Sequence, residues 1–232
     1  MKFGIIGAMD MEVDLLKENM ENVEVVETAR MKFYDGTLSG QKATLVRSGI
    51  GKVNAALAAE IIISRFNADV IINTGCAGAL DKELSIGDTV ISKDAVEHDL
   101  DTSAIGFKKG EHPFMNIRFF EADENLIKRA EAAVKAIAPD VKIKLGRICT
   151  GDQFISSKEK KAELVEEFQG SCAEMEGASI AHVCYMYDAP FVIIRAISDQ
   201  ADDKGQMSFE EFAPIASKRS AAITKYMIES WK

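Results

Sequence analysis

Short apolar runs rich in β-branched residues alternate along this chain with longer segments in which apolar residues recur at helical spacing. The runs predict strands, and several of them lack polar residues on either face. Strands that are apolar on both faces lie in the middle of a sheet that helices cover on each side. The pattern therefore predicts an α/β fold with a central, mostly parallel mixed sheet. The predicted strands are residues 3–8, 43–48, 69–75, 88–92, 142–148 and 190–198.

The helical segments lie between these strands and at the end of the chain. Ser208, followed three residues later by Glu211, predicts a capping box at the start of the last one. No linker or low-complexity stretch interrupts the alternation, so we expect a single domain over residues 1–232. The predicted helices are residues 51–66, 123–137, 157–168, 177–187 and 208–230.

The charge balance argues against a nucleic-acid partner. The chain has 28 basic and 37 acidic residues, a net charge of −9, and no dense Lys/Arg cluster. No run of about 18 uncharged apolar residues predicts a membrane span, so we expect no membrane partner and a cytoplasmic location. The four cysteines form no C-x-x-C pair, and we expect reduced thiols.

The histidines do not predict a metal site. His98, His112 and His182 show no metal-site spacing with a cysteine, so we expect neither a metal nor a cofactor. His182 lies within a helical apolar pattern and is interpreted as structural. The acidic stretch EHDLD at 97–101 could bind a divalent ion, but a solvated loop is the favoured interpretation.

Ligands of α/β sheets bind beyond the carboxyl ends of the strands. Carboxylates dominate the residues at these positions, whereas a phosphate site would be rich in glycine amides, helix N-termini and Lys or Arg. The positions are residues 9–12, 49–51, 75–78, 152–155, 174–176 and 198–199.

The glycine pattern SGIGKVN at 48–54 matches no nucleotide-binding motif completely. Val46 and Val53 occupy positions that a P-loop gives to glycine and to Ser/Thr, and Asn54 replaces the third glycine of a dinucleotide fingerprint. A nicotinamide enzyme stays a minor alternative. Tight strand-to-helix turns that let a ligand approach the backbone explain these glycines equally well.

Each candidate carboxylate also has a structural interpretation. Glu12 lies in the first turn of a helix that we expect Asp10 to cap, where the helix dipole favours acids whatever the function. Asp199 ends an apolar strand and could cap the following loop. Glu174 and Glu176 point to opposite faces if their segment is extended, and geometry alone does not choose between them.

Carboxylates with apolar neighbours suit a reaction whose transition state is cationic and whose leaving group needs a proton. Cleavage of a glycosidic bond through an oxocarbenium-like state is such a reaction. One acid protonates the leaving group, another carboxylate activates water, and a third can bind a ring hydroxyl. This division requires that burial raise the pKa of the acid.

Six segments, spread in order over the whole chain, closely resemble the 5′-methylthioadenosine/S-adenosylhomocysteine nucleosidases of the nucleoside phosphorylase superfamily. The resemblance implies a nucleoside phosphorylase-like fold, hydrolysis of 5′-thio-substituted adenosines to adenine and a thioribose, and a part in methionine salvage. The segments are GIIGAMDMEV at 4–13, SGIGKVNAA at 48–56, INTGCAGAL at 72–80, GDQFI at 151–155, EMEGASIAHVC at 174–184 and RAISDQAD at 195–202.

The resemblance also implies roles for single residues. Glu12 corresponds to the residue that activates water, and Asp199 to the acid that protonates adenine N7. Glu176 corresponds to the carboxylate that binds the ribose hydroxyls, with Met175 against the sugar and Glu174 in a peripheral, assisting position.

Further positions correspond to the walls of the family's site. Phe154 and Ile155 match the segment that stacks on the base and hydrogen-bonds it through the backbone, and Gly78, Cys76 and Ser198 belong to the same site. The pocket for the 5′ group would comprise Met9, Ile50 and Phe209, completed by residues 105–113 of a partner subunit, including Pro113, in a homodimer.

Two departures leave the substrate ranking open. Cys76 stands where the family often has a serine, and Ile105 where some members have an aromatic residue. Two rival functions remain. A purine nucleoside phosphorylase would have an arginine where Asn73 and Thr74 stand, and a non-catalytic nucleoside-binding protein would not need the carboxylates. The resemblance does not choose among methylthioadenosine, S-adenosylhomocysteine, 5′-deoxyadenosine and futalosine-type nucleosides as the preferred substrate.

Overall fold

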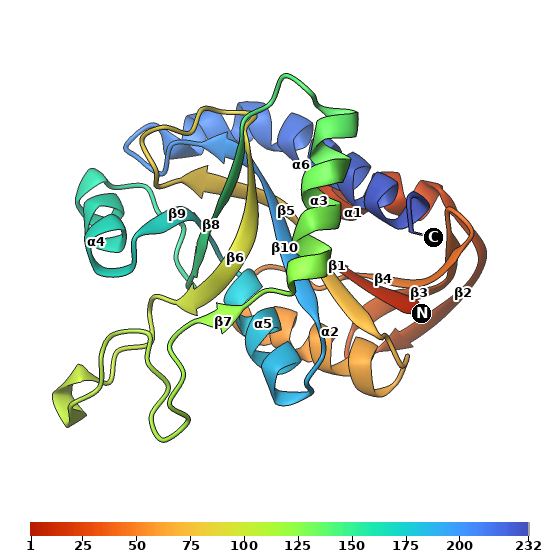
Figure 1. Ribbon diagram of the computed structural model, residues 1–232, viewed down its shortest axis with the longest axis horizontal. Coiled ribbons are helices and arrows are strands. Elements are labelled where there is room, and N and C mark those ends of the chain that lie inside the picture. Colours follow the sequence, from red (N-terminus) through yellow and green to blue (C-terminus); the bar gives the residue numbers. More distant parts are fainter. Residues whose placement is uncertain (232) are drawn as a thin grey trace.

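Ten strands form one mixed sheet in the computed structural model, which describes residues 1–231, and six α-helices cover it (Figure 1). The strands are β1 (Lys2–Gly7), β2 (Met20–Thr28), β3 (Met31–Leu38), β4 (Gln41–Arg47), β5 (Val70–Ala79), β6 (Thr89–Glu97), β7 (Phe120–Glu121), β8 (Ile143–Thr150), β9 (Gly170–Glu174) and β10 (Phe191–Asp199). The helices are α1 (Asp10–Glu18), α2 (Lys52–Ser64), α3 (Glu124–Ile137), α4 (Lys158–Phe168), α5 (Gly177–Met186) and α6 (Gly205–Glu229), with a 3₁₀ turn at Ser103–Ile105.

Five strands close into a ring. The order β10-β6-β8-β9-β5 returns to its start because β10 also pairs with β5, and β1, β4, β3 and β2 continue outward from β5. Parallel pairs join β4, β1, β5 and β10, whereas β2 and β3 add antiparallel pairs at the edge. The predicted α/β class with a central mixed sheet is therefore confirmed.

Helices cover both faces, which explains why the central strands lack polar alternation. Along β10, Val192 and Ile194 pack in the core beneath α1, α3 and α6, whereas Ile193 packs in the core shared with α2 and α5. Successive side chains of a strand point to opposite faces, so both faces must be apolar. Figure 1 shows α6 and α3 on one side and α2 and α5 on the other.

The predicted strands lie within a few residues of their observed positions, with one consequential error. Residues 75–78 do not follow a strand but belong to β5, which continues to Ala79. The strands β2, β3, β7 and β9 are not among the predicted ones. Most residues of β2 are exposed, and glutamates interrupt its valines, so no apolar run marks this strand.

Two predicted helix starts are wrong. The last helix begins at Gly205, three residues before Ser208, with Lys204 as its N-cap residue, and the Lys204 N–H donates to Asp202 Oδ1 at 3.0 Å in the preceding turn. In α1, Met9 and not Asp10 is the N-cap residue. Asp10 is the first helical residue and pairs with the exposed Arg47 at 3.1 Å.

Among residues 1–231, none of the helices combines the length and the apolar character needed to span a lipid bilayer.

Candidate active site

Arg195 lies in the middle of the candidate carboxylates. The β10 strand places it opposite Gly75 of β5, and only 2% of its surface is exposed. Its Nη2 donates to Asn73 Oδ1 at 2.6 Å and to Glu174 Oε2, and lies 3.9 Å from Glu176 Oε2. Burial disfavours the charged guanidinium, but Glu174, Glu12 and Glu176 outweigh burial and raise the pKa of Arg195. The cation therefore persists at any working pH.

Glu12 is fixed by main-chain donors at the end of β1 and in β5. Its Oε2 accepts from the N–H groups of Ala8 at 2.7 Å and Met9 at 3.0 Å, and its Oε1 accepts from Cys76 N–H at 3.1 Å. The side chain is buried. Glu12 thus accepts from main-chain donors just before its helix and from one donor in β5.

Cys76 places a thiol beside the Glu12 carboxylate. Its Sγ lies 3.6 Å from Glu12 Oε1. Burial, followed by the charge of Glu12, raises the pKa of the Cys76 thiol. A protonated thiol is a weak donor, so Cys76 can hydrogen-bond Glu12 but not replace a hydroxyl in full.

Glu174 is committed to internal contacts. Besides Arg195, it accepts from Thr150 Oγ1 and from the N–H groups of Glu176 at 3.1 Å and Gly177 at 2.7 Å. The β9 strand ends at Glu174, so the chain is not extended through Glu176. The condition under which the two carboxylates would face opposite ways is therefore not met, and both approach Arg195.

Glu176 retains more hydrogen-bonding capacity. Its Oε1 accepts from Gly51 N–H at 2.9 Å, and its Oε2 has Arg195 only at 3.9 Å. Burial, then the neighbouring Glu174 charge, raises the pKa of Glu176 to about 8. A group of this kind can donate or accept a hydrogen bond near neutral pH.

Asp199, the last residue of β10, is buried beside a small cavity. Its Oδ1 accepts from Ala201 N–H at 2.8 Å and its Oδ2 from Ser198 Oγ at 2.9 Å. Burial raises the pKa of Asp199, against the opposing effect of the Ala201 hydrogen bond. The cavity, of about 30 Å³, is lined by Gly78, Gln153, Phe154, Ile155, Ala173, Glu174, Met175, Asp199 and Ala201.

Most of the predicted apolar wall also assembles. Met9 and Phe209 both pack against the small cluster of Cys76, Ala196, Ala213 and Ala216. The Phe209 ring meets Phe154 edge-on with centroids 5.6 Å apart. Ile50 is half exposed and precedes Gly51, the donor to Glu176.

Pro113 does not line the cavity at Asp199 in its own chain. It lies in the segment between β6 and β7, which Figure 1 shows protruding from the body in yellow-green. Pro113 itself is half-buried, but Ile105 and Phe114 in this segment are 67% and 88% exposed.

Two features of the site region were missed or misread. Arg195 was not singled out, although a lone arginine in an otherwise apolar strand is a signal for a buried ion cluster. The prediction of a solvated loop at 97–101 is mostly wrong. Glu97 ends β6, His98 is buried, and Asp99 pairs with Lys52 at 2.7 Å.

Comparison with known proteins identifies the family. A profile of the phosphorylase superfamily matches residues 2–229. The 5′-methylthioadenosine/S-adenosylhomocysteine nucleosidase of Staphylococcus haemolyticus is 42% identical over 227 residues, which are 97% of this chain and 98% of that protein. The chain belongs to this nucleosidase family. The nucleosidases that it resembles are hydrolytic N-glycosidases.

Solved nucleosidase structures agree with this assignment. The Neisseria meningitidis nucleosidase in complex with methylthio-immucillin-A has a TM-score of 0.95 and 42% identity, covering 99% of both chains. The futalosine hydrolase of Helicobacter pylori has a TM-score of 0.94 and 35% identity, covering 99% of this chain and 98% of its own. The shared fold alone therefore does not rank the substrates of a nucleosidase in this family.

Proposed function

We propose that this protein hydrolyses the N-glycosidic bond of 5′-methylthioadenosine and S-adenosylhomocysteine, and also of 5′-deoxyadenosine. The observation that carries the proposal is the placement of two buried carboxylates in different surroundings. Asp199 has a raised pKa and lines a cavity, whereas Glu12 is held by three main-chain N–H groups. Family membership supplies the substrate class.

In this proposal Asp199 is the general acid. It donates its proton to adenine N7 while the bond between C1′ and N9 breaks and its electron pair stays with the base. Burial, which raises the pKa of Asp199, keeps the proton available closer to neutral pH. Ser198 supports the role because its hydroxyl donates to Asp199 and orients the carboxyl group.

Glu12 is the general base. Water loses a proton to Glu12 and bonds to C1′ from the face opposite the departing adenine. The three main-chain bonds hold Glu12 in one orientation, and the Cys76 thiol lies beside it. Arg195 balances the charge of this carboxylate and its neighbours as a positioning residue.

Glu176 binds the ribose hydroxyls, and Met175 packs against the sugar. The free hydrogen-bonding capacity of Glu176 supports this choice over Glu174, whose oxygens already serve four donors. The two form a pair in which Glu174 holds Arg195 and Glu176 meets the substrate. This assigns Glu174 an assisting role through its contacts.

Gly78, Phe154 and Ile155 bind adenine. A cavity of about 30 Å³ holds about one water molecule, so a purine requires part of its wall to move. Phe154, which is 46% exposed, is the wall residue best placed to swing outward and then stack on the base.

Met9, Ile50 and Phe209 receive the 5′ group, and the partner subunit's segment 105–113, with its Pro113, completes this pocket in a homodimer. The exposed apolar side chains of Ile105 and Phe114 support such an assembly, because contiguous exposed apolar surface favours association. Four unpaired, buried cysteines support a cytoplasmic location.

The contacts of Asn73 and Thr74 argue against phosphorolysis. Asn73 donates to Ile6 O at 2.9 Å and accepts from Arg195, and Thr74 shares a 2.7 Å hydrogen bond with Ser220. Neither offers the bidentate cation that phosphate prefers, and Glu12 would repel the anion.

The experiment that tests the function is adenine release from methylthioadenosine, followed by chromatography in phosphate-free buffer and with phosphate added. We expect equal rates and free methylthioribose as the second product. Release that requires phosphate and yields a sugar 1-phosphate would overturn the hydrolytic mechanism. Absence of release with every 5′-substituted adenosine would favour the non-catalytic nucleoside-binding alternative.

A further inference from the structure

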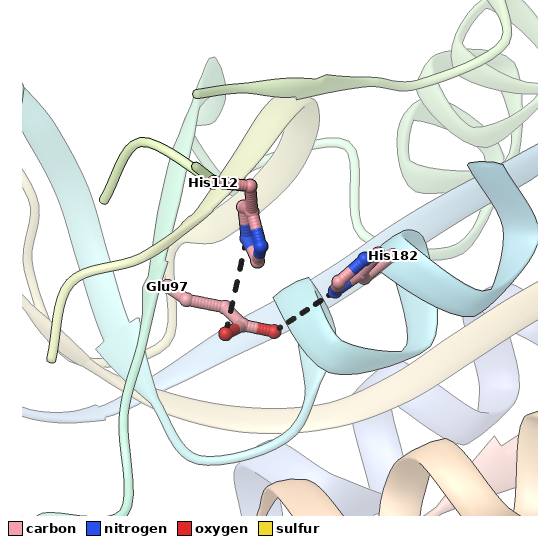
Figure 2. A group of neighbouring side chains, drawn as sticks. All are labelled: Glu97, His112 and His182. Carbon is pink, nitrogen blue, oxygen red and sulfur yellow. Dashed lines mark ion pairs between the residues drawn. The ribbon is translucent and has the colours of Figure 1, made fainter. Parts of the chain in front are cut away.

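Two histidines and a glutamate from three separate segments converge away from the carboxylates around Arg195. Glu97 ends β6, His112 lies between β6 and β7, and His182 is on α5. Figure 2 shows both imidazoles directed at the Glu97 carboxylate. His182 Nδ1 lies 3.6 Å from Glu97 Oε1, and His112 Nε2 lies 4.0 Å from Glu97 Oε2. Among residues 1–231, this is the one group of three potential metal ligands within 4.8 Å of one another.

The Nε2 atom of His112 has no hydrogen-bond partner, although the residue is only 8% exposed. The 4.0 Å separation from Glu97 is too long for a hydrogen bond. The imidazole of His112 packs against two aromatic rings: its centroid lies 5.4 Å from that of Phe120 and 4.3 Å from that of His182. A buried polar atom without a partner costs free energy, so this nitrogen points to a ligand between the three side chains.

We propose that Glu97, His112 and His182 bind one divalent transition-metal ion, with Zn²⁺ the best fit. Two imidazoles and one carboxylate suit zinc and its neighbours in the first transition row, whereas Ca²⁺ and Mg²⁺ prefer oxygen ligands alone. Three protein ligands leave a fourth position for water. A solvent-connected cavity of about 440 Å³, lined in part by Glu97 and His182, provides the entry path.

The observed spacing requires only a small contraction. Tetrahedral zinc with bonds of about 2.0–2.1 Å sets its ligand atoms about 3.3 Å apart. The pairs at 3.6 and 4.0 Å need to approach by less than about 1 Å, and the pair of imidazole nitrogens, which lies within 4.8 Å, by at most about 1.5 Å, which side-chain adjustment can supply.

Lys52 is the cation that competes with the metal. Its Nζ lies 3.7 Å from Glu97 Oε2, but it is held more closely by Asp99, at 2.7 Å. Lys52 can therefore stay with Asp99 when the ion binds.

The metal would fasten the protruding segment to the body of the protein, because His112 belongs to that segment while Glu97 and His182 belong to β6 and α5. His112 immediately precedes Pro113. If the proposed function holds, the ion thereby fixes the segment that reaches the partner's 5′ pocket. Metal binding itself is independent of that function and is tested separately.

The test is titration of the metal-free full-length protein with Zn²⁺ by calorimetry, and with Co²⁺ by visible absorption. We expect one ion per chain and a Co²⁺ spectrum of tetrahedral intensity. His112→Gln, His182→Gln and Glu97→Gln should each weaken binding by about tenfold or more. Glu111→Gln, next to His112 but outside the cluster, should bind as the wild type does.

Lys52→Met gives the opposite expectation, because removal of the competing cation should tighten Zn²⁺ binding. Hydrogen exchange of residues 98–118 should slow when the wild type binds Zn²⁺. Failure of the wild type to bind Zn²⁺ at micromolar protein concentration would overturn the proposal. Binding that survives all three ligand substitutions would also overturn it, whether or not adenine release is observed.

Discussion

Arg195 and Gly75 lie opposite each other in the parallel pairing of β10 with β5, and the missing side chain of Gly75 is what lets Arg195 and Glu12 approach. A Cβ atom at position 75 would lie 2.5 Å from Glu12 Oε1 and 2.9 Å from Arg195 Nη1. Both atoms belong to buried, hydrogen-bonded groups. The glycine is therefore a requirement of the ion cluster and not of a turn.

Gly75→Ala should displace Glu12 and lower kcat for adenine release by about tenfold or more, because small misplacement of a catalytic group has large effects on rate. The far-UV circular dichroism spectrum should stay that of the wild type. Gly40→Ala is the control: a Cβ there would meet no atom within 4 Å, and the strain of its φ of +78° should lower stability without changing kcat. Equal activity of Gly75→Ala and the wild type would contradict this packing requirement.

Glu12→Gln should fold and bind substrate analogues but lose about 10²-fold or more in kcat, the scale of a missing general base. The glutamine can still accept from the main-chain N–H groups that Glu12 serves. Glu18→Gln, at the exposed end of the same helix, should leave kcat unchanged. A Glu12→Gln chain that fails to fold would support a purely structural role in starting α1.

Glu176 makes the free energy of unfolding depend on pH. Its pKa of about 8 in the folded protein exceeds its usual value of 4.5, so the folded protein retains a proton that the unfolded chain releases between these values. The Glu176 contribution to stability is thus present below pH 4.5 and falls as pH rises toward about 8, by at most about 1.4 kcal/mol per pH unit.

Glu176→Gln should remove this slope, so that the difference in stability between variant and wild type changes steadily from pH 5 to about 8. Urea unfolding at several pH values measures the effect. A difference that stays constant over this range would mean that Glu176 is ionised throughout.

The exposed apolar side chains of the segment between β6 and β7 predict a dimer contact. Ile105→Ser combined with Phe114→Ser should shift the protein toward monomer in light scattering and raise KM for substrates with large 5′ groups more than for 5′-deoxyadenosine. Val25→Ser, on the exposed face of β2, is the control. A fully active wild-type monomer would rule out the partner's contribution to the site.

Part of this site could be predicted because its residues stand in short, ordered motifs. Glu12 follows and Asp199 ends a strand that the apolar pattern marks, and Met9 and Phe209 pack against the same small cluster. The role of Arg195 depends on partners 21 to 183 positions away, namely Glu174 and Glu12. Such pairings are set by sheet register, which the pattern of a single strand does not contain.

The same limit applies to the proposed metal site. Glu97 and His182 are 85 positions apart in sequence, and only the packing of α5 against β6 brings them together. The spacing of ligand residues along the chain therefore does not indicate this group. The edge strand β2 was missed for a different reason, because exposed strands carry no apolar run.

The most direct test of the mechanism compares Asp199→Asn with the wild type in two measurements. One is kcat for adenine release from methylthioadenosine, and the other is Kd for a non-hydrolysable adenosine analogue. We expect kcat to fall by about 10²-fold or more while Kd changes only a few-fold, because the lost proton matters in bond cleavage and not in binding. Turnover within a few-fold of the wild type would contradict Asp199 as the general acid.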